Sequence, residues 1–203
     1  MILRPLVLAL GFASLAFLPG PAFAAAAKAP AAAAPAEAAL PVWTSGPGST
    51  LTFESSYDGE SFEGGFSDFR AEIAFDPARL SASRFDVRIA LASANTENDE
   101  RDETLHGAEF FNVAALSDAR YTATSFRALP DGRFVADGEL ALNGAKQAVP
   151  LTFRWVGGAS PRLEGTATLN RLAFNVGIGD WGDLEMMPDS VTVTTTLVLK
   201  PSR

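Results

Sequence analysis

The sequence predicts an all-β fold, an antiparallel barrel of eight strands that closes on itself. Beyond Pro41, apolar and polar residues alternate with a period of two, which is the period of β-strands. Turn dipeptides such as Asn143-Gly144 separate these runs at the spacing of short hairpins, and no helical period extends beyond a few turns. The pattern therefore predicts strands joined by tight turns.

The first 24 residues have the pattern of a secretory signal peptide. A single cation, Arg4, precedes an apolar run from Leu6 to Leu18, and the segment ends in the small-residue sequence Ala22-Phe23-Ala24. The apolar run is shorter than the roughly 20 residues that a bilayer requires. We expect cleavage after Ala24, export to the periplasm, and no membrane span in the mature protein.

Residues 25–40 are almost entirely Ala and Pro, and they predict a flexible linker. Such a segment has too little apolar surface to compensate for the entropy lost on ordering. Its prolines, Pro30 and Pro35, interrupt any helix that the alanines could form. The folded domain is therefore expected to comprise residues 41–203.

The charge and cysteine content of the domain exclude several functions. The whole chain carries a formal charge of -8, and setting aside Arg4, Lys28 and Glu37 removes two positive charges and one negative charge, which leaves -9. Such an acidic domain disfavours nucleic acid and anionic membrane surfaces as partners. The absence of cysteine rules out thiol nucleophiles and thiolate metal sites.

Two adjacent runs show the clearest strand pattern. In residues 69–75 every second side chain is apolar and falls on one face, and residues 85–91 repeat the pattern after the turn signal Asp76-Pro77. They are expected to be neighbouring antiparallel strands. The other expected strands cover residues 51–57, 120–126, 133–142, 148–155, 162–169 and 190–199.

The acidic stretch from residue 96 to 112 contains His106, the only histidine in the chain. It lacks the regular spacing of a calcium loop, and zinc would need more nitrogen or sulfur ligands than one histidine supplies. A helix start explains it better, because Thr96 can cap a helix whose first turn is acidic. A Ser-His-Asp triad would have to use His106, and no Gly-x-Ser-x-Gly elbow occurs. We expect neither a metal site nor an enzyme.

A series of short segments occurs in order along the domain, namely Gly64–Phe69, Phe75–Pro77, Ser93–Thr96, Arg101-Asp102, Leu105, Phe110-Phe111, Tyr121, Ser125-Phe126, Gly138–Val149 and Asn170–Gly177. In their order and spacing these segments resemble the YceI-like family, exported lipocalin-like barrels that bind polyisoprenoid lipids such as quinones. The resemblance implies an eight-stranded lipocalin-like barrel in which residues 101–111 form a short helical lid across one end.

The inner faces of the expected strands, together with the lid, supply the residues predicted to contact a ligand. They are Phe53, Phe69, Ala71, Ile73, Phe75, Phe85, Val87, Ile89, Leu91, Leu105, Phe110, Phe111, Phe153 and Trp155. A headgroup at the mouth of the barrel would need polar partners, for which Arg101, Asp102, Arg171 and Asn175 are candidates. The alternative for each of these four is that it is a surface or loop-fixing residue.

Two functions remain open from the sequence. The first is a periplasmic lipid carrier that holds an isoprenoid quinone or a similar long-chain lipid, without a covalent cofactor. The second is an interaction module with a filled barrel, whose lid and GDWGDLEMM loop bind a protein in envelope stress or electron transport. A solid core also uses large side chains, so composition does not separate the two. A homodimer is compatible with both.

We expect the exported protein to begin at Ala25, because the signal-peptide pattern ends in Ala22-Phe23-Ala24. The intact mass of the protein recovered from the periplasm measures this directly. A species that still begins at Met1 and fractionates with membranes would instead indicate an anchored protein.

Overall fold

The structure is a computed structural model that describes residues 38–202. The expected signal peptide, residues 1–24, and residues 25–37 of the expected linker lie outside the described residues. Leu40 is already buried, so packed structure begins just before Pro41. No helix within residues 38–202 is both long and apolar enough to cross a bilayer.

The described chain contains eleven strands, one α-helix and four short 3-10 helices. The strands are β1 (Trp43–Ser45), β2 (Thr50–Tyr57), β3 (Glu60–Phe66), β4 (Phe69–Ala74), β5 (Arg84–Ala90), β6 (Ala94–Asn95), β7 (Asp118–Ala128), β8 (Phe134–Leu142), β9 (Ala145–Val156), β10 (Arg162–Asn170) and β11 (Ser190–Pro201). The helices are α1 (Asp99–His106), η1 (Leu80–Ala82), η2 (Leu91–Ser93), η3 (Arg171–Phe174) and η4 (Gly179–Gly182).

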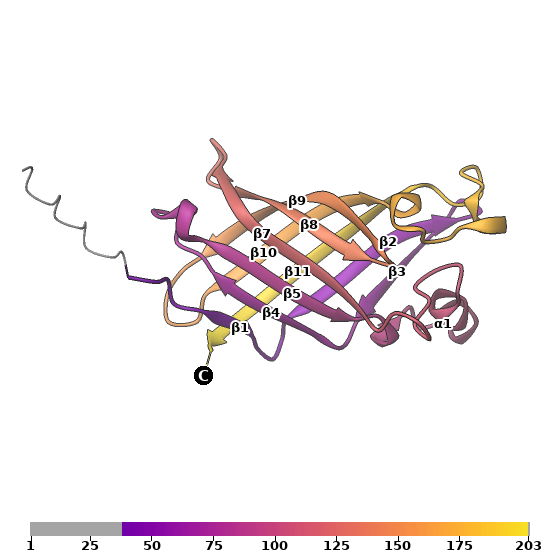
Figure 1. Cartoon of the computed structure of the whole chain (residues 1–203), viewed down its shortest axis with the longest axis horizontal. Helices are drawn as coiled ribbons and strands as arrows, with labels where there is room; N and C mark the ends of the chain where they lie inside the picture. Colours follow the sequence, from indigo (N-terminus) through magenta and orange to yellow (C-terminus); the bar gives the residue numbers. More distant parts are fainter. Residues whose placement is uncertain (1–37, 203) are drawn as a thin grey trace, which may run out of the picture. The chain divides into compact units, whose positions relative to one another are not determined.

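The sheet closes into a barrel, which confirms the predicted fold. Every pairing is antiparallel, and the ring of eight strands runs β1-β4-β5-β7-β8-β9-β10-β11 and returns to β1. The closing strand β1 pairs with β4 through Trp43 and Ile73 and with β11 through Trp43 and Pro201. In Figure 1 the strands wind diagonally around the barrel, with α1 at one end and the C-terminus at the other.

All eight expected strands are present, and three further strands were not expected. The predicted neighbours β4 and β5 pair in the register Ala71↔Val87 and Ile73↔Phe85. The unexpected strands are β1, β3 and β6, of which β3 pairs with β2 and extends the sheet beyond the ring. Glycines are depleted in strands, so the Gly64-Gly65 pair is the reason that β3 was not predicted. Gly64 is required there, because a Cβ would lie 2.3 Å from the ring of Phe53.

A dense cluster of aromatic rings fills the barrel at the end opposite α1. Phe75, which follows β4, lies at its centre. Its ring centroid is 6.1 Å from Phe85, 5.7 Å from Phe126, 5.0 Å from Phe134, 5.1 Å from Phe153 and 5.2 Å from Trp155. We call these six residues the aromatic plug. Edge-to-face and tilted rings at such distances pack favourably, so this end of the interior is solid.

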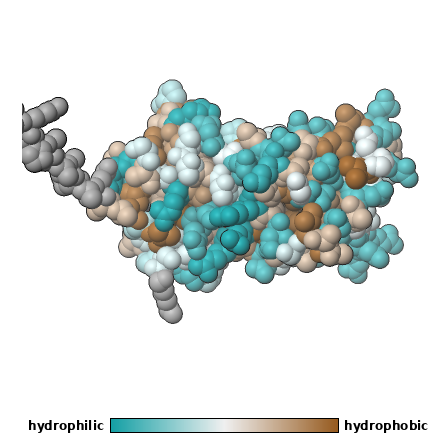
Figure 2. All heavy atoms as spheres, viewed as in Figure 1, coloured by the Kyte–Doolittle hydropathy of each residue, from teal (hydrophilic) through white to brown (hydrophobic). Residues whose placement is uncertain are grey.

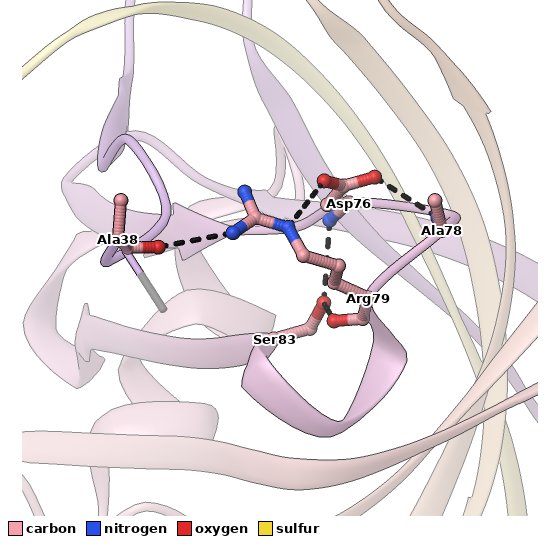
Figure 3. A network of polar contacts seen from close by, with 5 residues as sticks. All are labelled: Ala38, Asp76, Ala78, Arg79 and Ser83. Carbon is pink, nitrogen blue, oxygen red and sulfur yellow. Dashed lines mark hydrogen bonds and ion pairs between the residues drawn. The ribbon is translucent and has the colours of Figure 1, made fainter. Parts of the chain in front are cut away.

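The loop between β4 and β5 is fixed by a polar network at the plugged end (Figure 3). Arg79 Nε donates to Asp76 Oδ2 over 2.9 Å, and Arg79 Nη1 donates to the carbonyl of Ala38 over 3.0 Å. The hydroxyl of Ser83 accepts from the amide of Asp76. The Arg79 guanidinium holds the pKa of Asp76 below its ordinary value. The network joins the start of the domain to the rim of the plug.

Phe75→Ala is expected to lower the free energy of unfolding by about 3–5 kcal/mol, because it empties the centre of a packed aromatic cluster. Urea denaturation of the purified domain measures the change. Phe62→Ala is the matched control, since Phe62 is only half-buried and touches none of the plug rings. Its loss should stay below about 2 kcal/mol. Equal losses at both positions would contradict a solid plug.

Candidate functional site

An apolar cavity of about 180 Å³ occupies the barrel interior between the aromatic plug and α1. Thirty residues line it, and twenty-six of these are apolar. A cavity of about 150 Å³ lined by Leu, Ile and Phe stays dry and binds benzene, so this cavity can accept an apolar group. A longer chain would have to displace flexible lining side chains such as Met187.

The structure brings ten of the fourteen predicted ligand-contacting residues together in the cavity wall. These ten are Phe53, Phe69, Ile73, Phe85, Val87, Ile89, Leu91, Leu105, Phe110 and Phe111. The other four, Ala71, Phe75, Phe153 and Trp155, belong to the packed core at the plugged end and do not line the cavity. Alternation along a strand identifies its inner face but not the height of a residue in the barrel. Contact of the ten with a ligand stays a prediction.

The opposite wall of the cavity was missed by the sequence analysis. It comes from the second half of the barrel and includes Leu140, Leu142, Val149, Leu169, Val191 and Val193. The same alternation that identified the first half is present here, for example at Leu140 and Leu142 in β8. Alternation therefore could have identified this wall, but the prediction selected mainly aromatic positions and these residues are aliphatic.

Helix α1 covers the end of the cavity, but its cap differs from the expected one. Asn98, not Thr96, accepts a hydrogen bond from the amide of Arg101 at the start of the helix. Thr96 is buried and donates through its hydroxyl to Asp102 Oδ1 over 2.6 Å, and through its amide to the same oxygen over 2.8 Å. Asp102 thus ties α1 to the chain that precedes it.

Two of the proposed headgroup partners are engaged in fixing this helix. Asp102 also accepts from the side-chain amide of Asn95 over 2.8 Å. Arg101 Nε donates to the Thr96 hydroxyl over 2.9 Å, and its guanidinium carbon lies 4.7 Å from the ring centroid of Phe62. Both residues therefore act as loop-fixing residues. Asn175, a third candidate, ends η3 in a left-handed conformation with φ of 56°.

Three segments meet at this end of the barrel, and we call residues 57–60, 96–116 and 171–189 together the helix end. The amides of Gly177 and Ile178 donate to the carbonyl of Glu109 over 2.7 and 3.1 Å. The amide of Asp58 donates to the carbonyl of Met186 over 2.8 Å. The rings of Tyr57 and Phe110 both pack on Trp181. The cavity is covered by loops rather than by the sheet.

Arg171, the fourth headgroup candidate, lines the cavity and organises the loop that follows it. Its side chain is buried, and all five of its N–H groups donate to backbone carbonyls. The acceptors are Pro188 for Nε, Val176 and Gly177 for Nη1, and Trp181 and Met187 for Nη2. Burial lowers the pKa of Arg171, and the nearby Asp189 opposes that shift. An arginine nevertheless stays charged in proteins, so the loop folds around a buried cation.

Tyr121 places a hydroxyl against the cavity wall without exposing a free donor. Its hydroxyl lies 3.1 Å from the carbonyl oxygens of both Ala136 and Val149, so its proton is engaged by the backbone. Burial raises the pKa of Tyr121 above its ordinary value, which keeps the phenol neutral. Gly138 makes room for the ring, because a Cβ there would lie 2.3 Å from Tyr121.

The acidic residues around His106 do not form a recognisable metal centre. Within residues 38–202, no group of three or more His, Asp or Glu side chains is placed to hold a metal ion. His106 lies in the last turn of α1, and its Nε2 atom is buried. Asp99, Glu100 and Asp102 lie in the first turn, where the helix dipole favours negative charge.

Comparison with known proteins places the chain among similar barrels. The family model of the YceI-like domain matches residues 44–199. A UPF0312 protein of Ectopseudomonas mendocina is 31% identical over 134 residues, which cover 62% of this chain and 70% of that protein. A UPF0312 protein of Shewanella baltica is 27% identical over 166 residues, which cover 78% of this chain and 84% of the relative.

Two solved structures share the fold at low sequence identity. The crystal structure of Burkholderia cenocepacia BcnA superposes with a TM-score of 0.71 at 24% identity and covers 74% of this chain and 95% of that one. A polyisoprenoid-binding domain from Saccharophagus degradans superposes with a TM-score of 0.61 at 18% identity and covers 80% of this chain and 99% of that one.

Arg171→Met is expected to lower the free energy of unfolding by about 3 kcal/mol, since it leaves five backbone carbonyls, most of them buried, without their charged donor. Hydrogen exchange should show the loss first in residues 176–187, which hold most of the acceptors. Arg120→Met is the control, because that arginine pairs with Asp86 at the surface. A loss of less than about 1 kcal/mol is expected there. If both variants behave alike, Arg171 does not organise the loop.

Proposed function

The chain belongs to the YceI-like family, and from this premise we propose that it is a periplasmic lipid-binding carrier that holds a polyisoprenoid of the quinone type in its cavity. The observation that carries the proposal is the apolar cavity inside a closed barrel. An isoprenoid tail that enters such a cavity gains about 0.8 kcal/mol per buried CH₂ before ordering costs. Apolar contacts alone can therefore give useful affinity.

The comparisons support this choice of ligand. The Saccharophagus degradans domain that shares the fold is described as polyisoprenoid-binding. The lining here is suited to the same chemistry, because its aliphatic and aromatic side chains offer no charge to the tail apart from Arg171, whose donors are occupied. A branched hydrocarbon tail requires no hydrogen bonds, so such a wall is sufficient.

The proposal assigns no catalytic step to the protein. Four polar residues line the cavity, namely Ser55, Tyr121, Arg171 and Thr195. No carboxylate or imidazole is among them, and the Tyr121 hydroxyl is engaged by backbone carbonyls, so these side chains offer no free general acid or base. Binding and release of a lipid need neither.

One observation favours the second candidate, a protein-interaction module. Several apolar side chains are exposed at the helix end, with Leu184 54%, Tyr57 43% and Ile178 40% accessible. Figure 2 shows hydrophobic atoms among hydrophilic ones at this end of the barrel. A carrier also needs a surface where its ligand is exchanged, so these side chains are compatible with both functions, whereas the cavity is explained only by the first.

Ala167→Phe is expected to displace the lipid while the barrel stays folded, because Ala167 lines the cavity and the added ring can occupy it. Native mass spectrometry of the protein purified from the periplasm measures bound lipid, and organic extraction identifies it. The wild type should carry about one lipid per chain, and the variant should carry at least several-fold less.

Ala71→Phe is the matched control for this experiment. Ala71 is fully buried beside the plug and does not line the cavity. The same enlargement should overpack the core and cost about 1–3 kcal/mol of stability without emptying the cavity. A wild-type protein without lipid, together with a strongly destabilised Ala167→Phe variant, would support a filled barrel instead.

A further inference from the structure

Ser55 is the one polar residue in the cavity wall whose side chain has no hydrogen-bond partner within residues 38–202. Tyr121 bonds to the backbone of β8 and β9, and Thr195 Oγ1 donates to the carbonyl of Thr50 over 3.1 Å. Arg171 uses all its donors within the loop at residues 176–188. Among the described residues that line the cavity, the Ser55 hydroxyl is therefore the one polar group left to bind a polar atom of a ligand.

The position of Ser55 places this hydroxyl near the helix end. Ser55 lies in β2 opposite Phe62 of β3, two residues before Tyr57 at the tip of the hairpin. Its Oγ atom is buried, and a buried hydroxyl without a partner is unfavourable. A ligand whose polar end lies close to the helix end can supply that partner, while its apolar tail extends toward the plug.

The helix end carries all of the net charge of the described domain. Its three segments contain twelve carboxylates and two arginines, Arg101 and Arg171. The remaining described residues contain eleven acidic and eleven basic side chains and are therefore neutral as a set. Hydrogen bonds and ring contacts hold the three segments together, so the negative charge surrounds the covered end of the cavity.

Neither arginine of the helix end is available to neutralise an anionic ligand. The guanidinium of Arg171 already donates to five carbonyls. Arg101 donates to the hydroxyl and carbonyl of Thr96 and lies over the ring of Phe62. A phosphate ester, which carries about -1.5 to -2 charges at pH 7, would meet a potential of its own sign without a charged donor.

We propose that the cavity selects isoprenoids with an uncharged hydrogen-bonding head, such as a hydroxyl or a quinone carbonyl, which Ser55 Oγ binds, and that the carboxylates of the helix end reject phosphorylated isoprenoids. The inference rests on the proposed function and defines the ligand class of the same cavity. Tail burial gives affinity, Ser55 recognises the head, and the surrounding charge discriminates against anions.

Three ligands with the same carbon skeleton test the proposal on the mature chain. They are farnesol, farnesyl monophosphate and the saturated hydrocarbon farnesane, each tritium-labelled and measured by equilibrium dialysis. Farnesol should bind more tightly than the phosphate by about tenfold or more at low ionic strength. The ratio should shrink several-fold at about 0.5 M salt, where the screening length falls to roughly 4 Å.

Variants at Ser55 test the recognition of the head. Ser55→Ala should weaken the binding of farnesol by about three- to tenfold and leave the binding of farnesane unchanged, because only farnesol loses a hydrogen bond. Ser55→Thr, which keeps a hydroxyl, should retain the difference between the two ligands. The unliganded Ser55→Ala protein should melt no lower than the wild type, since the hydroxyl it lacks has no protein partner. Equal weakening of farnesol and farnesane would overturn the assignment to Ser55.

Charge variants test the rejection of phosphate. Asp180→Lys combined with Glu185→Lys reverses two exposed charges at the helix end and should raise affinity for farnesyl monophosphate several-fold, with farnesol unaffected. Glu72→Lys combined with Glu164→Lys makes the same charge change on the barrel wall and should have a much smaller effect. Wild-type affinity for the phosphate equal to that for farnesol at low salt overturns the inference alone. Binding of none of the three ligands overturns the proposed function as well.

Discussion

The pairing of β1 with both β4 and β11 is the constraint on which the rest of the structure depends. A closed ring pairs each of its eight strands on both sides and encloses an interior of fixed width, which in an eight-stranded barrel suits either packed side chains or one small ligand. Only three residues, Trp43–Ser45, complete the ring. β1 pairs with the C-terminal end of β11, whereas β2, which follows it in the chain, pairs with β11 at Thr192–Thr196. As a result β2 and β3 extend the wall toward the helix end.

The two ends of this interior are filled by different kinds of side chain. The plugged end uses rings that interlock around Phe75, and a cluster of this kind leaves no room for a guest. The end near α1 is lined mostly by aliphatic side chains of β8 to β11, which face the phenylalanines of β2, β3 and the segment after α1. The interior of the barrel is therefore solid in one half and encloses a cavity in the other.

The sequence predicted the architecture because a period of two is a local property. Alternation in residues 69–75 and 85–91 reported the inner faces correctly, and the Asn143-Gly144 dipeptide located the hairpin between β8 and β9. The division between plug and cavity is not local, because it depends on how far each strand is shifted against its neighbours. Phe75 and Phe85 share the inner face, yet only Phe85 reaches the cavity. Three-residue β1 is likewise too short to show a period.

The polar residues of the site were harder to predict, because their roles depend on partners distant in the sequence or on the exact path of a loop. Threonine is a common helix cap, but the hydroxyl of Thr96 donates a hydrogen bond to the buried carboxylate of Asp102. Asn98 caps the helix instead. Arg171 was a candidate headgroup partner, and only the path of the loop after it, which places five carbonyls around its guanidinium, shows that it is a loop-fixing residue. Its charge is compensated by the dipoles of these carbonyls and by the nearby carboxylate of Asp189.

This arrangement also explains how a cavity inside a closed barrel can exchange its contents. The sheet is held by long ladders of backbone hydrogen bonds, whereas the covering segments are joined by fewer bonds, among them those at Glu109, Asp58, Asn143 and Arg171, and by the rings on Trp181. Local opening costs least where few contacts must break, so we expect the helix end to open before any strand separates. The end expected to open most readily is also the end that carries the net negative charge, so in the proposed carrier the head of the ligand would pass that charge on entry.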